Sequence, residues 1–237
     1  MNLRFSYRAS IYRSEGEEKD KVLFARSSIN FQFISMLEEK REKFKKIENR
    51  VGEIFSKLKL SPNQLTFNSI IFAIFSFCFL INQNLIWALI FFTFTAFFDF
   101  IDGAVARFLK METKKGAYLD TICDRYVEGI ILLGFLFLPL KEFLFLPAEA
   151  WIFLAFFGSL MTTYAKAAAK EKELVREELK KGLFGRGERI ILIFLTIFLG
   201  IFNFSWMIYP IIVLAILSNF TAIQRIYLGF KSPTDYS

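Results

Sequence analysis

Long apolar stretches alternate with short polar ones from residue 65 onward. Six of them are predicted to be membrane-spanning helices, at about 65–81, 85–106, 117–140, 148–168, 188–204 and 206–226. Several lie near the short end of the roughly 17–25 residues that a helix needs to cross a bilayer. The pattern predicts an all-α integral membrane protein, with six transmembrane helices in one domain over 61–237.

The first 60 residues are expected to form a separate basic head. Residues 1–64 hold 14 of the 30 Lys and Arg residues and 9 of the 23 acidic ones. Within residues 38–60, apolar side chains recur at helical spacing: Phe44, Ile47, Val51, Ile54, Phe55 and Leu58. This pattern predicts an N-terminal amphipathic juxtamembrane helix. The sequence leaves open whether its apolar face lies on the membrane surface or packs on the protein itself.

Composition supports the membrane class and narrows the chemistry. Hydrophobic residues make up 54% of the chain, against about 45–50% in soluble domains. There is no histidine, which excludes histidine bases, Ser-His-Asp triads and histidine metal sites. Cys78 and Cys123 lie in or beside apolar segments without CxxC spacing, as buried small hydrophobes do. Acid–base and metal chemistry therefore falls to Asp, Glu, Lys, Arg or Tyr.

The distribution of basic residues predicts the orientation in the membrane. In the six-helix topology, four polar stretches share one face: 1–64, 107–117, 166–189 and 225–237. With Arg125 just inside it, that face holds 29 of the 30 Lys and Arg residues, and Lys141 alone lies opposite. Because Lys and Arg collect in cytoplasmic loops, we expect a multi-pass cell-membrane protein with both termini and the active site cytoplasmic.

Four aspartates interrupt the apolar pattern. Asp99 and Asp102 end the second segment, and Asp120 and Asp124 begin the third. The first pair is spaced i,i+3 and the second i,i+4, so the two members of each pair share one helix face. The short connection between the segments favours a helical hairpin, which brings the two pairs together.

Converging carboxylates repel one another unless a cation neutralises them. Oxygen-rich sites without histidine suit hard divalent cations. We expect Mg²⁺ here, and Mn²⁺ is the alternative. Gly103 would let a ligand approach the helix backbone, and Arg107 suits a phosphate or a carboxylate. The alternative is that the aspartates pair with Arg107, Arg125 and nearby lysines as helix-end charges. It is disfavoured because ionisable groups within a membrane are mostly functional.

These residues resemble a known family. The pattern Asp99-x2-Asp102-Gly103-x2-Ala106-Arg107-x8-Gly116-x3-Asp120-x3-Asp124 matches every fixed position of the CDP-alcohol phosphatidyltransferase signature. The resemblance covers about 61–226, whereas residues 1–45 resemble no family. It implies a six-helix membrane enzyme, usually a homodimer, of EC 2.7.8 type. Such enzymes move a phosphatidyl-type group from a CDP-linked lipid to a hydroxyl acceptor and release CMP.

The resemblance also implies roles for single residues. Asp99, Asp102 and Asp120 would hold the metal, while Asp124 would join them and act as general base on the acceptor hydroxyl. The absence of histidine supports a carboxylate base. Residues implied to bind the cytidine diphosphate are Asn63, Thr66, Asp102, Gly103, Arg107 and Gly116.

Basic residues at segment ends bear on the acceptor. Lys166, Arg186 and Arg189 face the level of the aspartates, and Arg225 approaches the same depth. Fixed cations beside a metal site favour an acceptor that carries a phosphate; alternatively they bind lipid headgroups or only follow the positive-inside rule. The TYAKAAA and GLFGRGER stretches resemble the phosphatidylinositol phosphate and archaetidylinositol phosphate synthase branch. By that similarity, all four would bind the phosphate of inositol 1-phosphate.

Several alternatives stay open. Glycerol 3-phosphate also fits the cations, serine fits less well, and a soluble inositol compound is a further candidate. Low Gln with high Lys, Glu and Ile is typical of thermophiles, many of them archaea, which favours an archaetidyl donor over a diacylglycerol one. An ion or phosphate transporter is disfavoured because all four aspartates lie near one face. A membrane-tethered structural protein leaves the aspartates unexplained. No nucleic-acid partner is expected.

Overall fold

The structure is a computed structural model that describes residues 42, 45–57, 62–175 and 184–231. All regular structure in these ranges is helical, apart from an isolated bridge between Phe143 and Leu146. Residues 45–56 are helical and are called the head helix below. The helices that follow are α2 (Pro62–Ile81), α3 (Leu85–Phe108), α4 (Lys114–Phe135), α5 (Ala148–Glu171), α6 (Arg186–Phe202), the short 3-10 helix η1 (Phe204–Trp206) and α7 (Ile208–Phe230).

Helices α2 to α7 coincide with the six predicted segments, with shifted ends. The largest shift is in α4, which begins at Lys114 and ends at Phe135, whereas 117–140 was predicted. It begins earlier because the Thr113 hydroxyl accepts a hydrogen bond of 3.0 Å from the backbone N–H of Gly116 and caps the helix. It ends before Pro139, whose ring does not fit a helix interior.

Four of these helices are long and apolar enough to cross a membrane by length and composition: Gln64–Ile81, Leu85–Phe108, Ala148–Glu171 and Phe204–Phe230, the last including η1. The other two differ for local reasons. Helix α6 has only 17 residues, and the first half of α4 carries four charged residues, Lys114, Lys115, Asp120 and Asp124. The protein is thus a helical membrane protein, and the six-span topology stays a prediction.

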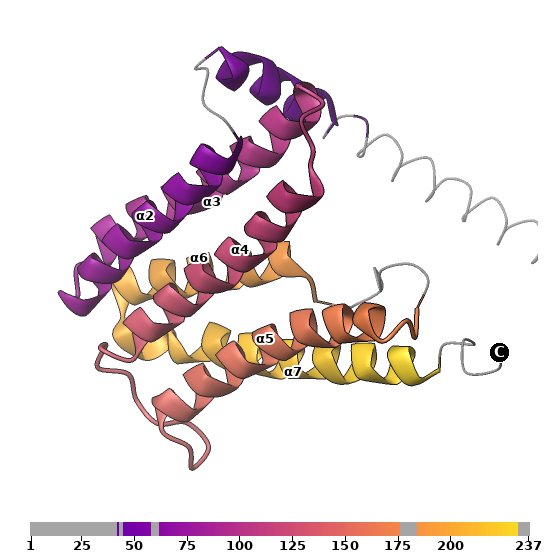
Figure 1. Ribbon diagram of the computed structural model, residues 1–237. Helices are drawn as coiled ribbons and strands as arrows, with labels where there is room; N and C mark the ends of the chain where they lie inside the picture. The colour runs from indigo at the N-terminus through magenta and orange to yellow at the C-terminus, as the bar shows by residue number, and fades with distance from the viewer. Residues whose placement is uncertain (1–41, 43–44, 58–61, 176–183, 232–237) are drawn as a thin grey trace, which may run out of the picture.

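The helices pack as pairs joined by α6 (Figure 1). Helix α5 runs along α7, and α2 packs on both α3 and α4, while α6 contacts α3 and α7. Small polar residues join α5 to α7: Ser159 lies 3.3 Å from Ser218, and Thr162 donates to the backbone carbonyl of Ser218 at 3.0 Å. Such residues let helix backbones approach closely in membranes. The fully buried side chains of the shared core include Phe92, Phe135, Ile197 and Leu214.

The head helix packs on the end of α3. A Cβ atom on Gly52 would lie 2.6 Å from the backbone oxygen of Ala104, so only glycine allows this approach. Val51 and Phe55 pack against a small buried cluster, Leu65, Ile101 and Val105.

Two other apolar side chains of the head helix point outward: Ile47 is 56% exposed and Ile54 is 61% exposed. The head helix thus packs on its own protein through Val51, Gly52 and Phe55, and its contact with the membrane surface stays a prediction. Phe44 and Leu58 lie outside the described residues.

Candidate active site

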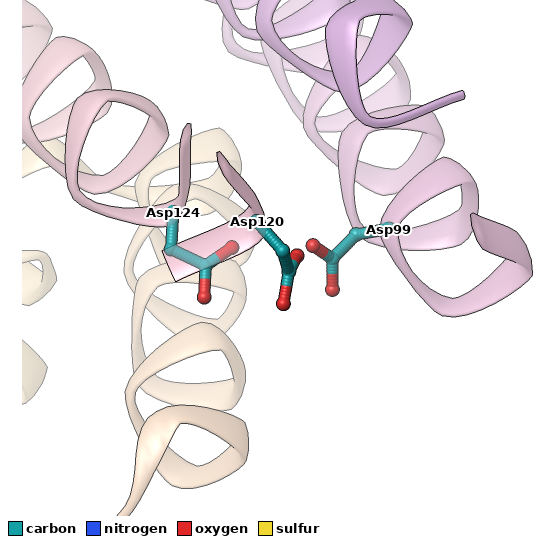
Figure 2. Close-up of side chains that lie close together, drawn as sticks. All are labelled: Asp99, Asp120 and Asp124. Carbon is teal, nitrogen blue, oxygen red and sulfur yellow. The ribbon is translucent and has the colours of Figure 1, made fainter. Parts of the chain in front are cut away.

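Three aspartates from two helices converge at the end of the α3–α4 hairpin. Asp99 comes from α3, and Asp120 and Asp124 come from successive turns of α4. Carboxylate oxygens of the three lie within 4.8 Å of one another (Figure 2). A set made of carboxylate oxygens suits Mg²⁺ or Mn²⁺. The donor chemistry therefore fits the divalent cation predicted from the sequence.

Asp102 lies beside this group and has a hydrogen-bond partner of its own. It lies one turn beyond Asp99, is 6% exposed, and accepts a hydrogen bond of 2.6 Å from the hydroxyl of Thr66 in α2. The three-carboxylate group in the described residues does not include it. The four predicted metal-ligating aspartates are thus arranged as a group of three and one hydrogen-bonded neighbour.

Arg186 enters the aspartate group from the start of α6. The backbone N–H of Gly185 donates to Glu188 at 2.9 Å, which caps the helix and makes Arg186 its first residue. The guanidinium of Arg186 forms ion pairs with Asp99 and Asp124 and lies 3.9 Å from Asp120. Arg186 was predicted to bind the acceptor phosphate, and here it engages the predicted metal ligands.

A cavity of about 280 Å³ opens beside Asp102 and Asp120. It is lined by five of the six residues implied to bind cytidine diphosphate: Thr66, Asp102, Gly103, Arg107 and Gly116. The side chain of the sixth, Asn63, lies outside the described residues. A Cβ on Gly103 would lie 3.0 Å from a nitrogen of Arg107, so glycine leaves room for the guanidinium beside the helix.

The remaining predicted cations lie on three helices. Arg189, one turn into α6, is 3% exposed. Arg225 on α7 donates to the backbone carbonyl of Thr162 on α5 at 2.8 Å. Lys166 is half-buried on α5, one turn beyond Thr162. Arg189 lies close enough to Arg225 and Arg186 for their charges to repel.

Sequence comparison assigns the family. The family described as CDP-alcohol phosphatidyltransferase matches residues 59–221, more than half of the chain. The chain belongs to the CDP-alcohol phosphatidyltransferase family. The protein is therefore a phosphotransferase enzyme.

Two relatives of this CDP-alcohol phosphatidyltransferase are named as synthases of inositol phosphate lipids. The chain is 34% identical over 197 residues to the archaetidylinositol phosphate synthase of Pyrococcus horikoshii, covering 83% of this chain and 97% of the relative. It is 28% identical over 196 residues to the phosphatidylinositol phosphate synthase of Mycobacteroides abscessus, covering 81% of this chain and 88% of the relative.

Solved structures show the same fold. The phosphatidylinositol phosphate synthase of Mycobacterium tuberculosis with CDP-DAG bound matches with a TM-score of 0.69 at 23% identity, over 81% of this chain and 98% of that one. The same enzyme in complex with manganese and citrate matches with a TM-score of 0.68 at 24% identity, over 80% and 92% of the two chains.

The structure of this CDP-alcohol phosphatidyltransferase adds charged residues that sequence reasoning did not assign to the site. Glu48 of the head helix pairs with Arg107. Glu128 is buried on α4, where it pairs with Arg125 and Arg189. Glu128 was detectable, because it follows Asp124 by four residues in an apolar segment and so shares its helix face. Glu48 carried no signal, since charged residues are abundant in the head.

Proposed function

We propose that this protein transfers an archaetidyl or related phosphatidyl-type group from a CDP-linked lipid to the hydroxyl of inositol 1-phosphate and releases CMP. One observation carries the proposal. Asp124 belongs both to the three-aspartate group and to a small hollow of about 30 Å³, whose charged lining also includes Arg125, Glu128, Arg186 and Arg189. A carboxylate that lies between a metal-type site and several arginines is suited to activate an acceptor that carries its own phosphate.

Similarity supports the choice of acceptor. The Pyrococcus relative is named for archaetidylinositol phosphate, and the alignment covers nearly its full length. The Mycobacteroides relative is named for the corresponding phosphatidyl product. The two names share the inositol phosphate head and differ in the lipid. The family implies a CDP-linked lipid as the donor, and we propose that its lipid part is archaetidyl.

The donor head is proposed to occupy the cavity of about 280 Å³ beside Asp102. The guanidinium of Arg107 supplies paired N–H donors for the diphosphate. Thr66 holds the Asp102 carboxylate in one orientation through its hydrogen bond. A relative with this fold has been solved with CDP-DAG bound.

Asp99, Asp120 and Asp124 would hold Mg²⁺, with Asp102 next to them. A relative with this fold has been solved with manganese. When bound, the divalent cation neutralises charge on the diphosphate and on the leaving CMP.

Asp124 takes the proton from the acceptor hydroxyl, whose oxygen forms a bond to the lipid-linked phosphorus. The bond from that phosphorus to CMP breaks, and CMP leaves with the bonding electrons. Lys166, Arg186, Arg189 and Arg225 would bind the acceptor phosphate.

The proposal includes the membrane arrangement. Six spans place both termini and the active site on the cytoplasmic side, since that face collects 29 of the 30 Lys and Arg residues. The charged starts of α4 and α6 would then lie near the cytoplasmic surface. A homodimer is proposed from the resemblance to the family.

The test is CMP release by purified protein with Mg²⁺ and a CDP-linked lipid, prepared with archaeol and with diacylglycerol. Inositol 1-phosphate, glycerol 3-phosphate, serine and free inositol are supplied in parallel. Release with inositol 1-phosphate alone is the expected result. Release only with another acceptor contradicts the proposed acceptor and leaves the aspartate site in place. No release from a folded, metal-loaded sample contradicts the reaction and favours the transporter alternative.

A further inference from the structure

A buried glutamate connects two arginines on different helices beside the candidate site. Glu128 lies one turn beyond Asp124 on α4 and is 7% exposed. One of its carboxylate oxygens accepts a hydrogen bond of 2.6 Å from Arg125. The other lies 3.0 Å from Nε of Arg189 on α6. Glu128 therefore joins α4 to α6 directly behind Asp124.

The arginines around Glu128 retain unused hydrogen-bond donors. The contact of Glu128 with Arg189 is close, but it is not aligned as a hydrogen bond. In the described part of the chain, the buried Nε groups of Arg125, Arg189 and Arg225 have no hydrogen-bond partner. Buried polar groups without partners are rare in folded proteins. Nε of Arg189 already lies against a carboxylate oxygen of Glu128, so the donors that indicate room for an anion are the Nε groups of Arg125 and Arg225.

The local charge agrees with a phosphate. Arg186 is engaged by aspartates, so its charge is already balanced. Arg125 and Arg189 share the single carboxylate of Glu128, and the charge of Arg225 acts on both of these arginines, which leaves a surplus of two positive charges among the four side chains. A phosphate monoester carries about −1.5 to −2 at neutral pH. The surplus therefore matches one phosphate group.

Stability alone does not explain such a cluster. Replacing a buried arginine–glutamate triad with apolar residues is often neutral or stabilising. What Glu128 supplies is orientation, since it contacts Arg125 and Arg189, and these three side chains line one hollow together with Asp124. Fixed donors lose less freedom when an anion binds.

We propose that Glu128 is a positioning residue of the acceptor site, which presents Arg125 and Arg189 to the phosphate of the acceptor beside Asp124. The inference rests on the proposed function and adds two residues, Arg125 and Glu128, to the acceptor site.

Glu128→Gln tests the proposal, because it preserves the side-chain shape and removes the charge. At saturating CDP-lipid, the KM for inositol 1-phosphate should rise at least about tenfold, while the KM for CDP-lipid stays within about twofold of wild type. A structural defect alone would move both. If Glu128 acted only through its negative charge, its removal would strengthen anion binding and lower the acceptor KM, and that result would overturn the proposal.

Two further variants complete the test. Glu128→Asp keeps the charge but is one methylene shorter, so it cannot reach both arginines, and its acceptor KM should rise too. Glu142→Gln, in the exposed connection between α4 and α5, is the matched control and should change neither KM. Should Glu128→Gln fail to fold, by size-exclusion in detergent, Glu128→Asp decides the question in the same assay.

Wild-type turnover separates this inference from the proposed function. If wild-type protein releases no CMP with inositol 1-phosphate, the proposed function fails. If wild-type protein does release CMP and both folded Glu128 variants keep its acceptor KM, only the role of Glu128 is overturned.

Discussion

The guanidinium of Arg107 forms an ion pair with the carboxylate of Glu48, 59 residues earlier in the chain. This contact joins the head helix to the family signature. Arg107 lines the cavity proposed for the cytidine diphosphate, so the carboxylate occupies donors that a diphosphate would use. The head helix is thereby part of the surroundings of the donor site, although it precedes residues 59–221, which match the family.

Removing this carboxylate should strengthen binding of the donor. Arg107 is 46% exposed, and an exposed ion pair contributes about 0–1 kcal/mol. Glu48→Gln should therefore lower the KM for CDP-lipid by up to about fivefold and leave the thermal midpoint nearly unchanged. Steady-state CMP release measures this, with Glu53→Gln on the exposed side of the same helix as the control. A higher KM would mean that Glu48 positions Arg107 instead of competing for it.

The packing of the head helix predicts a stability effect at Gly52. An added methyl group would meet the backbone oxygen of Ala104 and Cβ of Phe108 at 2.6 Å. Overpacking of this kind costs about 1–3 kcal/mol, so Gly52→Ala should lower the melting temperature in detergent by several degrees. Gly187→Ala is the matched control, because nothing lies within 4 Å of its added methyl group. Equal melting curves for the two variants would show that the head helix does not rest on α3.

The hydrogen bond between Thr66 and Asp102 predicts a loss in donor use. Thr66→Val is nearly isosteric and removes the hydroxyl, which costs the buried carboxylate a partner worth about 1–3 kcal/mol. We expect kcat/KM for CDP-lipid to fall about tenfold or more, with Thr66→Ser restoring most of it. Titrations with varied CDP-lipid at saturating acceptor measure both variants. A Ser variant as poor as the Val variant would assign the effect to packing.

Arg186 and a divalent cation are expected to compete for the same carboxylates. The guanidinium is paired with Asp99 and Asp124, so a metal ion must displace it or share these oxygens. Arg186→Gln should therefore bind Mn²⁺ more tightly, by roughly tenfold if about 1.4 kcal/mol of competition is removed. Calorimetric titration of the detergent-purified protein with Mn²⁺ measures this directly. Weaker binding would indicate that Arg186 instead organises the three aspartates.

Asp124 is predicted to be indispensable for turnover. Asp124→Asn keeps the shape and cannot accept a proton, so CMP release should be abolished while CDP-lipid binding is largely retained. Single-turnover CMP release and a separate CDP-lipid binding measurement distinguish the two steps. Wild-type rates in this variant would remove Asp124 from the role of general base.

Most of the correct predictions depend on residues that are close in the sequence. Helix periodicity and apolar runs are local properties, so the helical segments and the shared face of Asp120 and Asp124 could be predicted. The short connection around Thr113 also implied the hairpin that brings Asp99 to Asp124. The predicted helix ends were less accurate. The start of α4 depends on the Thr113 cap and its end on Pro139, and a hydropathy pattern reflects neither.

Tertiary packing decided which partner each charged group takes. Thr66 meets Asp102 across 36 residues, and Arg186 meets Asp99 across 87. Such pairs depend on how helices cross and rotate against one another, and spacing along one helix contains no information about either. For the same reason the sequence indicated that the aspartates converge, whereas packing gave Asp102 its partner Thr66 and placed Glu128 between two arginines. The sequence determined which helices carry the chemistry, and their packing determined which side chains meet.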